Sequence, residues 1–199
     1  MKNFLLSVIL LVFFSNLAIA QFNTGSKMVG ASSSLDFGFF SVKYQGAVDA
    51  TKYITINISP RAAYFIQNRI AIGGDINFDL LRSKYDDEDA GTYTEFLIGP
   101  FARYYYKSVA MVRPFGELNF GVGVSEIGKM GPMYESHNVL YTGAGIGAAF
   151  FLAENFALEG MLSYAYEHLK NKETDVSSNS HGIMLNFGFS FFFNSLLQE

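Results

Sequence analysis

The sequence has no cysteine, and beyond its first 20 residues it has no long apolar run. Without cysteine the chain forms no disulfides and carries no lipid on a cysteine. A domain without disulfides instead depends on fully paired backbone hydrogen bonds and on a large packed or lipid-covered surface. No later run approaches the roughly 18 apolar residues of a membrane-spanning helix. Disulfide-stabilised folds and helical membrane proteins are therefore excluded.

Basic residues are also scarce, with 14 Lys and Arg against 18 Asp and Glu and a formal net charge of −4 at pH 7. This balance argues against a nucleic-acid partner. The glycine-rich stretch from Gly143 to Gly147 lacks the lysine and the following helix of a phosphate-binding loop. The chain is instead rich in phenylalanine, tyrosine and glycine, with 21, 12 and 19 residues respectively.

The first 20 residues have the three parts of a secretory signal peptide. Lys2 precedes an apolar run from Phe4 to Phe14, and Ala18 to Ala20 form an A-x-A cleavage site. The run is too short to cross, as a helix, a bilayer core about 30 Å thick. We therefore expect cleavage between Ala20 and Gln21, and a single domain over residues 21–199.

Beyond Gln21, apolar and polar residues alternate in eight stretches separated by turn signals, which is the pattern of half-buried strands. Most of these stretches exceed the usual strand length of about five or six residues. They suit tilted membrane spans of about 9 to 11 residues with extensions beyond the membrane. The eight predicted strands cover residues 27–42, 52–66, 70–84, 93–106, 113–127, 138–152, 156–168 and 181–193.

The last stretch, His181 to Phe193, shows the alternation most clearly. Its bulky side chains share one face and its small or polar ones the other, and only Phe192 breaks the pattern. We interpret the bulky face as a lipid-facing surface on the strand that closes a barrel. This face consists of Ile183, Leu185, Phe187, Phe189, Phe191 and Phe193.

Two architectures fit exported, alternating strands, namely a soluble β protein and an outer-membrane barrel. Odd and even positions of a strand, its two parities, face opposite sides in both architectures, so the alternation alone does not separate them. Glycine favours the barrel, because most glycines lie on the polar parity. Glycine is a poor residue for an exposed strand face, but it suits the interior of an eight-stranded barrel, which is only wide enough for side chains. We predict an all-β fold, an eight-stranded antiparallel up-and-down transmembrane β-barrel in the outer membrane of a Gram-negative bacterium.

The predicted connections also alternate in length, as periplasmic turns and extracellular loops do in such barrels. The longer loops are expected over residues 43–51, 86–91, 128–137 and 169–180. Aromatic residues near both strand ends are typical of membrane-interface girdles. Those near the long loops are Tyr53, Tyr85, Tyr93, Tyr134 and Tyr141, and those near the short turns are Tyr64, Tyr104, Tyr106, Phe115 and Phe156.

Two segments resemble strand–turn–strand units of the outer membrane β-barrel domain family, the small OmpX/OmpA-like barrels. They run from Ser59 to Phe78 and, with a short interruption, from Ile98 to Gly123. The resemblance spans residues 25–193 and implies location and topology, since members of the family do many different things. The closing strand ends at Phe193, similar to the signal that barrel assembly machinery reads, although family members usually lack a tail such as Asn194 to Glu199.

Five charged residues of the polar parity are predicted to meet inside the barrel at similar depth. Charges in a narrow lumen must be paired and hydrogen-bonded. We therefore predict a network that fills the barrel and blocks flow, with a narrow or gated conduit as the alternative. Its members are Arg61, Asp75, Arg103, Glu117 and Glu159.

Two further groups lie at the predicted outer rim. The acidic run Asp86 to Asp89 lacks the spacing of an EF-hand loop, so we interpret it as a solvated loop tip, with divalent-ion or lipopolysaccharide bridging as the alternative. Three histidines invite comparison with lipid A-modifying enzymes, but adjacent strand residues point to opposite faces, so a Ser–His pair would have to form across strands. The sequence pairs concerned are Ser136-His137, Glu167-His168 and Ser180-His181.

The favoured hypothesis is a non-enzymatic outer-membrane barrel whose extracellular loops bind or shield, with a small pore or a lipid A-modifying enzyme as alternatives. No catalytic, cofactor or metal site is expected, and the chain is expected to be a monomer. Expected partners are outer-membrane lipid, lipopolysaccharide and, during biogenesis, the barrel assembly machinery. That machinery is expected to read the strand that carries Phe187, Phe189, Phe191 and Phe193.

Overall fold

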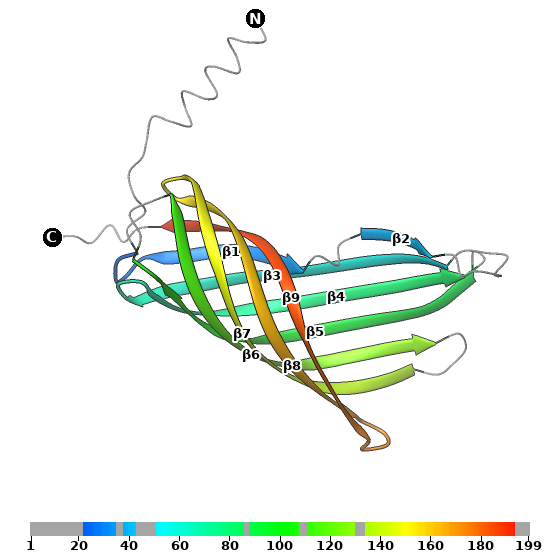
Figure 1. The fold of residues 1–199 in the computed structure, drawn as a ribbon. Helices are drawn as coiled ribbons and strands as arrows, with labels where there is room; N and C mark the ends of the chain where they lie inside the picture. The colour runs from blue at the N-terminus through cyan, green and yellow to red at the C-terminus, as the bar shows by residue number, and fades with distance from the viewer. Residues whose placement is uncertain are drawn as a thin grey trace, which may run out of the picture.

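The computed structural model describes residues 22–34, 38–42, 51–85, 88–107, 111–129 and 134–193. Antiparallel strands in these ranges coil into a single barrel (Figure 1). In this part of the chain, no helix is long and apolar enough to cross a bilayer. The strands are β1 (Lys27–Ser34), β2 (Gly38–Val42), β3 (Thr51–Gln67), β4 (Ile70–Tyr85), β5 (Glu88–Tyr105), β6 (Val112–Lys129), β7 (Tyr134–Ala153), β8 (Phe156–Asn171) and β9 (Ser177–Phe193).

The barrel closes through β1, which pairs with β3 on one side and with β9 on the other (Figure 1). Lys27 lies opposite both Tyr64 and Phe193. The remaining neighbours follow chain order, as expected for an up-and-down barrel. Since β1 and β2 are two parts of the predicted first strand, the barrel has eight strands, and the predicted fold class is confirmed.

β1 and β2 pair with β3 in different registers. Ser32 of β1 pairs with Ser59, whereas Gly38 of β2 pairs with Thr55, so six steps along the first strand correspond to four steps along β3. The register with β3 therefore shifts by two residues between β1 and β2. Among the described residues, β9 pairs with β1 only as far as Asn186, and its continuation toward Ser177 pairs with β8 alone.

Three predicted long loops are largely strand, which corrects the expected loop lengths. β4 and β5 continue to a pair between Tyr85 and Glu88, so Glu88 and Asp89 of the acidic run belong to a hairpin rather than to a loop tip. Asp86 and Asp87 lie outside the described residues. The hairpins β6–β7 and β8–β9 likewise extend into residues predicted as loops. The prediction was wrong because antiparallel pairing satisfies backbone groups whatever the polarity of the side chains.

The outward face of the barrel is apolar. All the bulky residues predicted on the outer face of β9, from Ile183 to Phe193, are exposed. Exposed isoleucine, leucine, valine and phenylalanine side chains continue this face around the wall. Examples from β3 to β8 are Ile58, Ile76, Ile98, Leu118, Ile146 and Leu162.

The predicted aromatic girdles are only partly present. Tyr64, Tyr104 and Tyr106 are exposed on the outer face near the short turns. Phe115 is instead buried in the interior, and Tyr93 and Tyr141 line an interior cavity. These three residues have the parity of the interior face, so nearness to a strand end was not sufficient to predict a girdle position. The side chains of Tyr53, Tyr85 and Tyr134 lie outside the described part of the chain.

Candidate functional site

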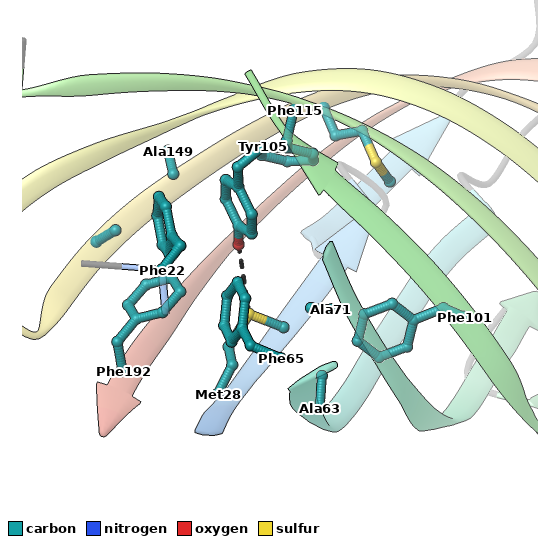
Figure 2. Packing of buried hydrophobic residues seen from close by; sticks show 12 residues of the cluster. Phe22, Met28, Ala63, Phe65, Ala71, Phe101, Tyr105, Phe115, Ala149 and Phe192 are labelled. Atoms are coloured by element: carbon teal, nitrogen blue, oxygen red, sulfur yellow. Dashed lines mark hydrogen bonds between the residues drawn. The ribbon is translucent and has the colours of Figure 1, made fainter. Parts of the chain in front are cut away.

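An aromatic plug fills the short-turn end of the lumen (Figure 2). Phe22, which precedes β1, is only 4% exposed and stacks on Tyr105 with a centroid distance of 4.2 Å. Its ring also lies 5.3 Å from Phe65 and 5.3 Å from Phe192. Aromatic rings at these separations add to the free energy gained by apolar burial. We call the set Phe22, Phe65, Tyr105, Phe115, Phe151 and Phe192 the aromatic plug.

Backbone hydrogen bonds fix the segment that carries Phe22 across this mouth. Arg69 N–H donates to the carbonyl of Phe22 at 2.9 Å, and Gly25 N–H donates to the carbonyl of Phe65 at 2.8 Å. The amide of Thr24 donates to Asn68 Oδ1 at 3.1 Å. The N-terminal segment is thereby attached to the β3–β4 turn and holds Phe22 in the lumen.

The plug contains the residue that broke the alternation of the last strand. Phe192 is buried against Phe22, Phe65 and Phe151, while its neighbours Phe191 and Phe193 face outward. The irregular residue was therefore a signal for an apolar layer inside the barrel. Phe22 gave no such signal because it lies outside any strand.

The five predicted lumenal charges form one ion-pair network directly above the plug. Arg61 contacts Glu117 at 3.0 Å and Asp75 at 3.1 Å. Arg103 contacts Glu117 at 2.6 Å and Glu159 at 2.8 Å. Two of these contacts join directly opposed residues, Arg61 with Asp75 and Arg103 with Glu117. Glu117 links the two halves, and Glu159 completes the set from the other side of the lumen.

Arg103 connects the ion-pair network to the aromatic plug. Its side chain is 2% exposed, and its guanidinium carbon lies 4.0 Å from the centroid of Phe115. The guanidinium also donates to the hydroxyl oxygen of Tyr105 at 3.0 Å, and the Tyr105 hydroxyl donates to Met28 Sδ at 3.4 Å. Because charges this deeply buried are costly unless fully paired, the two layers depend on each other.

A cavity of about 510 Å³ lies in the lumen above the ion-pair network. Its charged lining consists of Arg61 and of four carboxylates, those of Asp75, Asp79, Glu95 and Glu167. Asn57 donates to Asp79, and the Tyr93 hydroxyl donates to Glu95 at 2.6 Å. The lumen thus has three layers, with an apolar plug at the short-turn end, a charged layer above it and an acidic cavity beyond.

The histidines do not form the Ser–His arrangement of a rim enzyme within the described residues. His168 Nδ1 lies 2.6 Å from Asn179 Oδ1, and His137 Nε2 lies 3.4 Å from Asn171 Nδ2. His181 packs against the ring of Tyr164, on the outer face. No group of three His, Cys, Asp or Glu side chains in the described ranges has an arrangement that could hold a metal ion.

Two expected sites lie outside the described residues. The cleavage site at Ala20 and Gln21 is one, and the tail from Asn194 to Glu199 is the other. Both therefore remain predictions. The proposed assembly signal, which contains Phe187, Phe189, Phe191 and Phe193, lies on β9 with its side chains facing outward.

No protein-family model and no curated protein matches the chain. Among solved structures it is similar to Neisserial surface protein A, with 17% identity, a TM-score of 0.48 and coverage of 83% of this chain and 95% of the other. It is also similar to outer membrane protein OprG from Pseudomonas aeruginosa, with 12% identity, a TM-score of 0.48 and coverage of 89% and 100%. A third similar structure is the attachment invasion locus protein Ail of Yersinia pestis, with 17% identity, a TM-score of 0.47 and coverage of 85% and 99%.

The structure itself defines the class of protein. A closed antiparallel barrel satisfies its backbone hydrogen bonds internally, which is the condition for crossing a bilayer with strands. Its apolar outer face and its polar, charged lumen are the inverse of a soluble protein and match an outer-membrane barrel. The protein is an integral outer-membrane β-barrel. Its plugged end carries the turns β3–β4 and β7–β8, and in barrels of this class the end with the short turns faces the periplasm.

Proposed function

We propose that this protein is a non-enzymatic, non-conducting barrel that presents its extended hairpins as a binding or shielding surface outside the cell. The observation that carries the proposal is the double seal at the periplasmic end of the lumen. The aromatic plug and the ion-pair network lie on top of each other, and Arg103 of the network contacts Tyr105 and Phe115 of the plug. A pore would need both layers to open.

The hairpins β4–β5, β6–β7 and β8–β9 supply the surface for this function. Their paired strands continue well beyond the level of the ion-pair network, as the pairs Tyr85–Glu88, Gly128–Tyr134 and Lys170–Ser177 show. Extended β-hairpins hold side chains in fixed positions, so they form a more defined binding surface than loops do. We propose that lipopolysaccharide surrounds the base of these hairpins and that the chain acts as a monomer.

Planar-bilayer recordings test whether the lumen is sealed. Wild-type protein should give no channel events, whereas the double variant Phe22→Ala, Arg103→Ala should give them because it removes one member of each layer. The matched control is Phe189→Ala, which removes an exposed phenylalanine from the outer face. Steady conductance of the wild type would refute the proposal, as would a silent double variant that is correctly folded.

A cation-selective gated pore is the second candidate, and the acidic cavity is the observation that favours it. Four carboxylates and one cation, Arg61, line the cavity, so the acidic groups are in excess and a lumen opened at the plug should pass cations in preference to anions. Reversal potentials of the double variant in a salt gradient measure this preference. Mass spectrometry of lipid A from a deletion strain tests the rim-enzyme alternative, and we expect an unchanged lipid A profile.

A further inference from the structure

The outer face of the barrel has a hollow of about 630 Å³ that extends from β4 to β9. Small residues form its floor, namely Ala102, Gly116 and Ala144. Some of the most exposed apolar side chains of the outer face surround it. Ile183, Ile146 and Leu118 are 75%, 68% and 64% exposed. The barrel wall therefore has a groove among protruding side chains at this point.

The groove is mostly apolar, and the side-chain polar groups that its lining contributes from the outer face are the hydroxyls of Tyr104 and Tyr164. Arg103, Glu117 and Ser163 contribute to its lining, but their side chains are buried on the lumenal side, so only their backbone faces the groove. The backbone groups are already paired within the strands. The groove is continuous with the apolar surface that contacts the membrane. Its lining therefore matches a hydrocarbon chain.

A cation lies at the periplasmic end of the groove. Arg69 is in the β3–β4 turn next to Ile70, which lines the groove. Its guanidinium carbon lies 5.8 Å from the ring centroid of Tyr104, another lining residue. Arg69 makes no ion pair with any carboxylate of the described ranges, so its charge is available to a ligand at the membrane surface.

We propose that this groove holds one acyl chain of an anionic phospholipid from the periplasmic leaflet, with its headgroup phosphate against Arg69. The apolar walls and small floor residues fit a single chain, and the cation stands where the headgroup of that leaflet lies. The site is distinct from the lumen, so it stands whether or not the barrel conducts. A second copy of the chain is the competing occupant.

Native mass spectrometry of the folded protein, released from detergent with added phosphatidylglycerol or phosphatidylcholine, tests the proposal. Wild type should retain one phosphatidylglycerol and at least about tenfold less phosphatidylcholine, a ratio that corresponds to about 1.4 kcal/mol. Gly116→Leu and Ala144→Phe should each reduce retention about tenfold by filling the groove. A Cβ at Gly116 meets nothing closer than Tyr106 Oη at 3.8 Å, so this substitution is compatible with the fold.

The variant Arg69→Asn tests the contact with the headgroup. Asparagine is chosen because residue 69 has a φ of 72° and asparagine tolerates this left-handed conformation. This variant should bind the two lipids equally. Two variants serve as controls. Ala62→Phe enlarges an outward-facing side chain of β3, and Lys172→Asn removes a positive charge from the β8–β9 turn. Both should retain phosphatidylglycerol as wild type does.

Unchanged retention of phosphatidylglycerol in Gly116→Leu and Ala144→Phe would refute binding of the acyl chain in the groove. An unchanged preference for phosphatidylglycerol in Arg69→Asn would refute the contact between the headgroup and Arg69. A wild-type dimer that Gly116→Leu dissociates would show that a second copy occupies the groove, and would also overturn the proposal.

Discussion

Glu117 is the residue on which the ion-pair network depends. Its carboxylate accepts hydrogen bonds from both Arg61 and Arg103, so it is the only member that links the two halves through contacts between the five charges. Removing one partner from a buried pair leaves the other charge uncompensated, which costs more than the pair contributes. A single substitution in the ion-pair network should therefore lower the free energy of unfolding by more than the contribution of the one contact that it removes.

Arg103→Ala should lower the free energy of unfolding by about 3 to 5 kcal/mol, because it leaves Glu117 and Glu159 buried without their shared cation. Urea unfolding in lipid vesicles measures this loss. The control is Asp175→Asn, which breaks the solvent-exposed pair with Lys170 and should leave the unfolding midpoint unchanged. An Arg103→Ala variant as stable as wild type would show that the network does not stabilise the barrel.

Parity and depth were sufficient to predict the five charged residues, because a strand alternates strictly and a narrow lumen brings inward side chains together. The plug was not predictable in the same way. Phe22 reaches the lumen from a segment without periodicity, and its place depends on hydrogen bonds to the β3–β4 turn. The sequence contained only an indirect signal, the misplaced Phe192.

At the level of the strand, glycines allow the tight coiling of the wall. Gly99 and Gly123 face the lumen on neighbouring strands, and a Cβ at either position would overlap a backbone carbonyl, that of Phe120 or of Phe96. Glycine positions of this kind let strands bend sharply enough to close a small barrel. The sequence argument that glycine on the polar parity indicates a barrel interior therefore has a steric basis.

Gly99→Ala should reduce the yield of folded protein and its stability, because the clash is with backbone rather than with a flexible side chain. Gly182→Ala is the matched control, since a Cβ there has nothing within 4 Å. The fraction of folded protein after refolding into detergent, read from gel mobility without heating, compares the two variants. Equal folded fractions would mean that the wall adjusts to a methyl group at Gly99.

Strand ends were less predictable than strand existence. The hairpins β6–β7 and β8–β9 run through polar residues such as Ser136 and Asn179, which resemble loop residues when read locally. Each strand nevertheless continues because its neighbour supplies hydrogen-bond partners. Such pairing is a property of two segments together, so the pattern of one segment cannot predict it.

For the whole molecule, closure of the β1–β9 seam makes every strand of the membrane-spanning wall dependent on its neighbours. A closed barrel resists dissociation by detergent at room temperature and unfolds on heating. We expect the protein in outer-membrane fractions, with a gel mobility that differs between unheated and boiled samples. A single mobility combined with recovery from the soluble periplasmic fraction would contradict the membrane assignment.

The contact between Phe22 and Phe192 has a consequence for the timing of folding. The two rings are 5.3 Å apart, yet Phe22 precedes the first strand and Phe192 belongs to the last one. Contacts between such distant positions form slowly, because a long loop must close before they contribute. The plug cannot assemble until the last strand has been exported. Until then β1 and β8 lack their shared partner β9 and each has one unpaired edge, so the chain must be kept from aggregating in the periplasm.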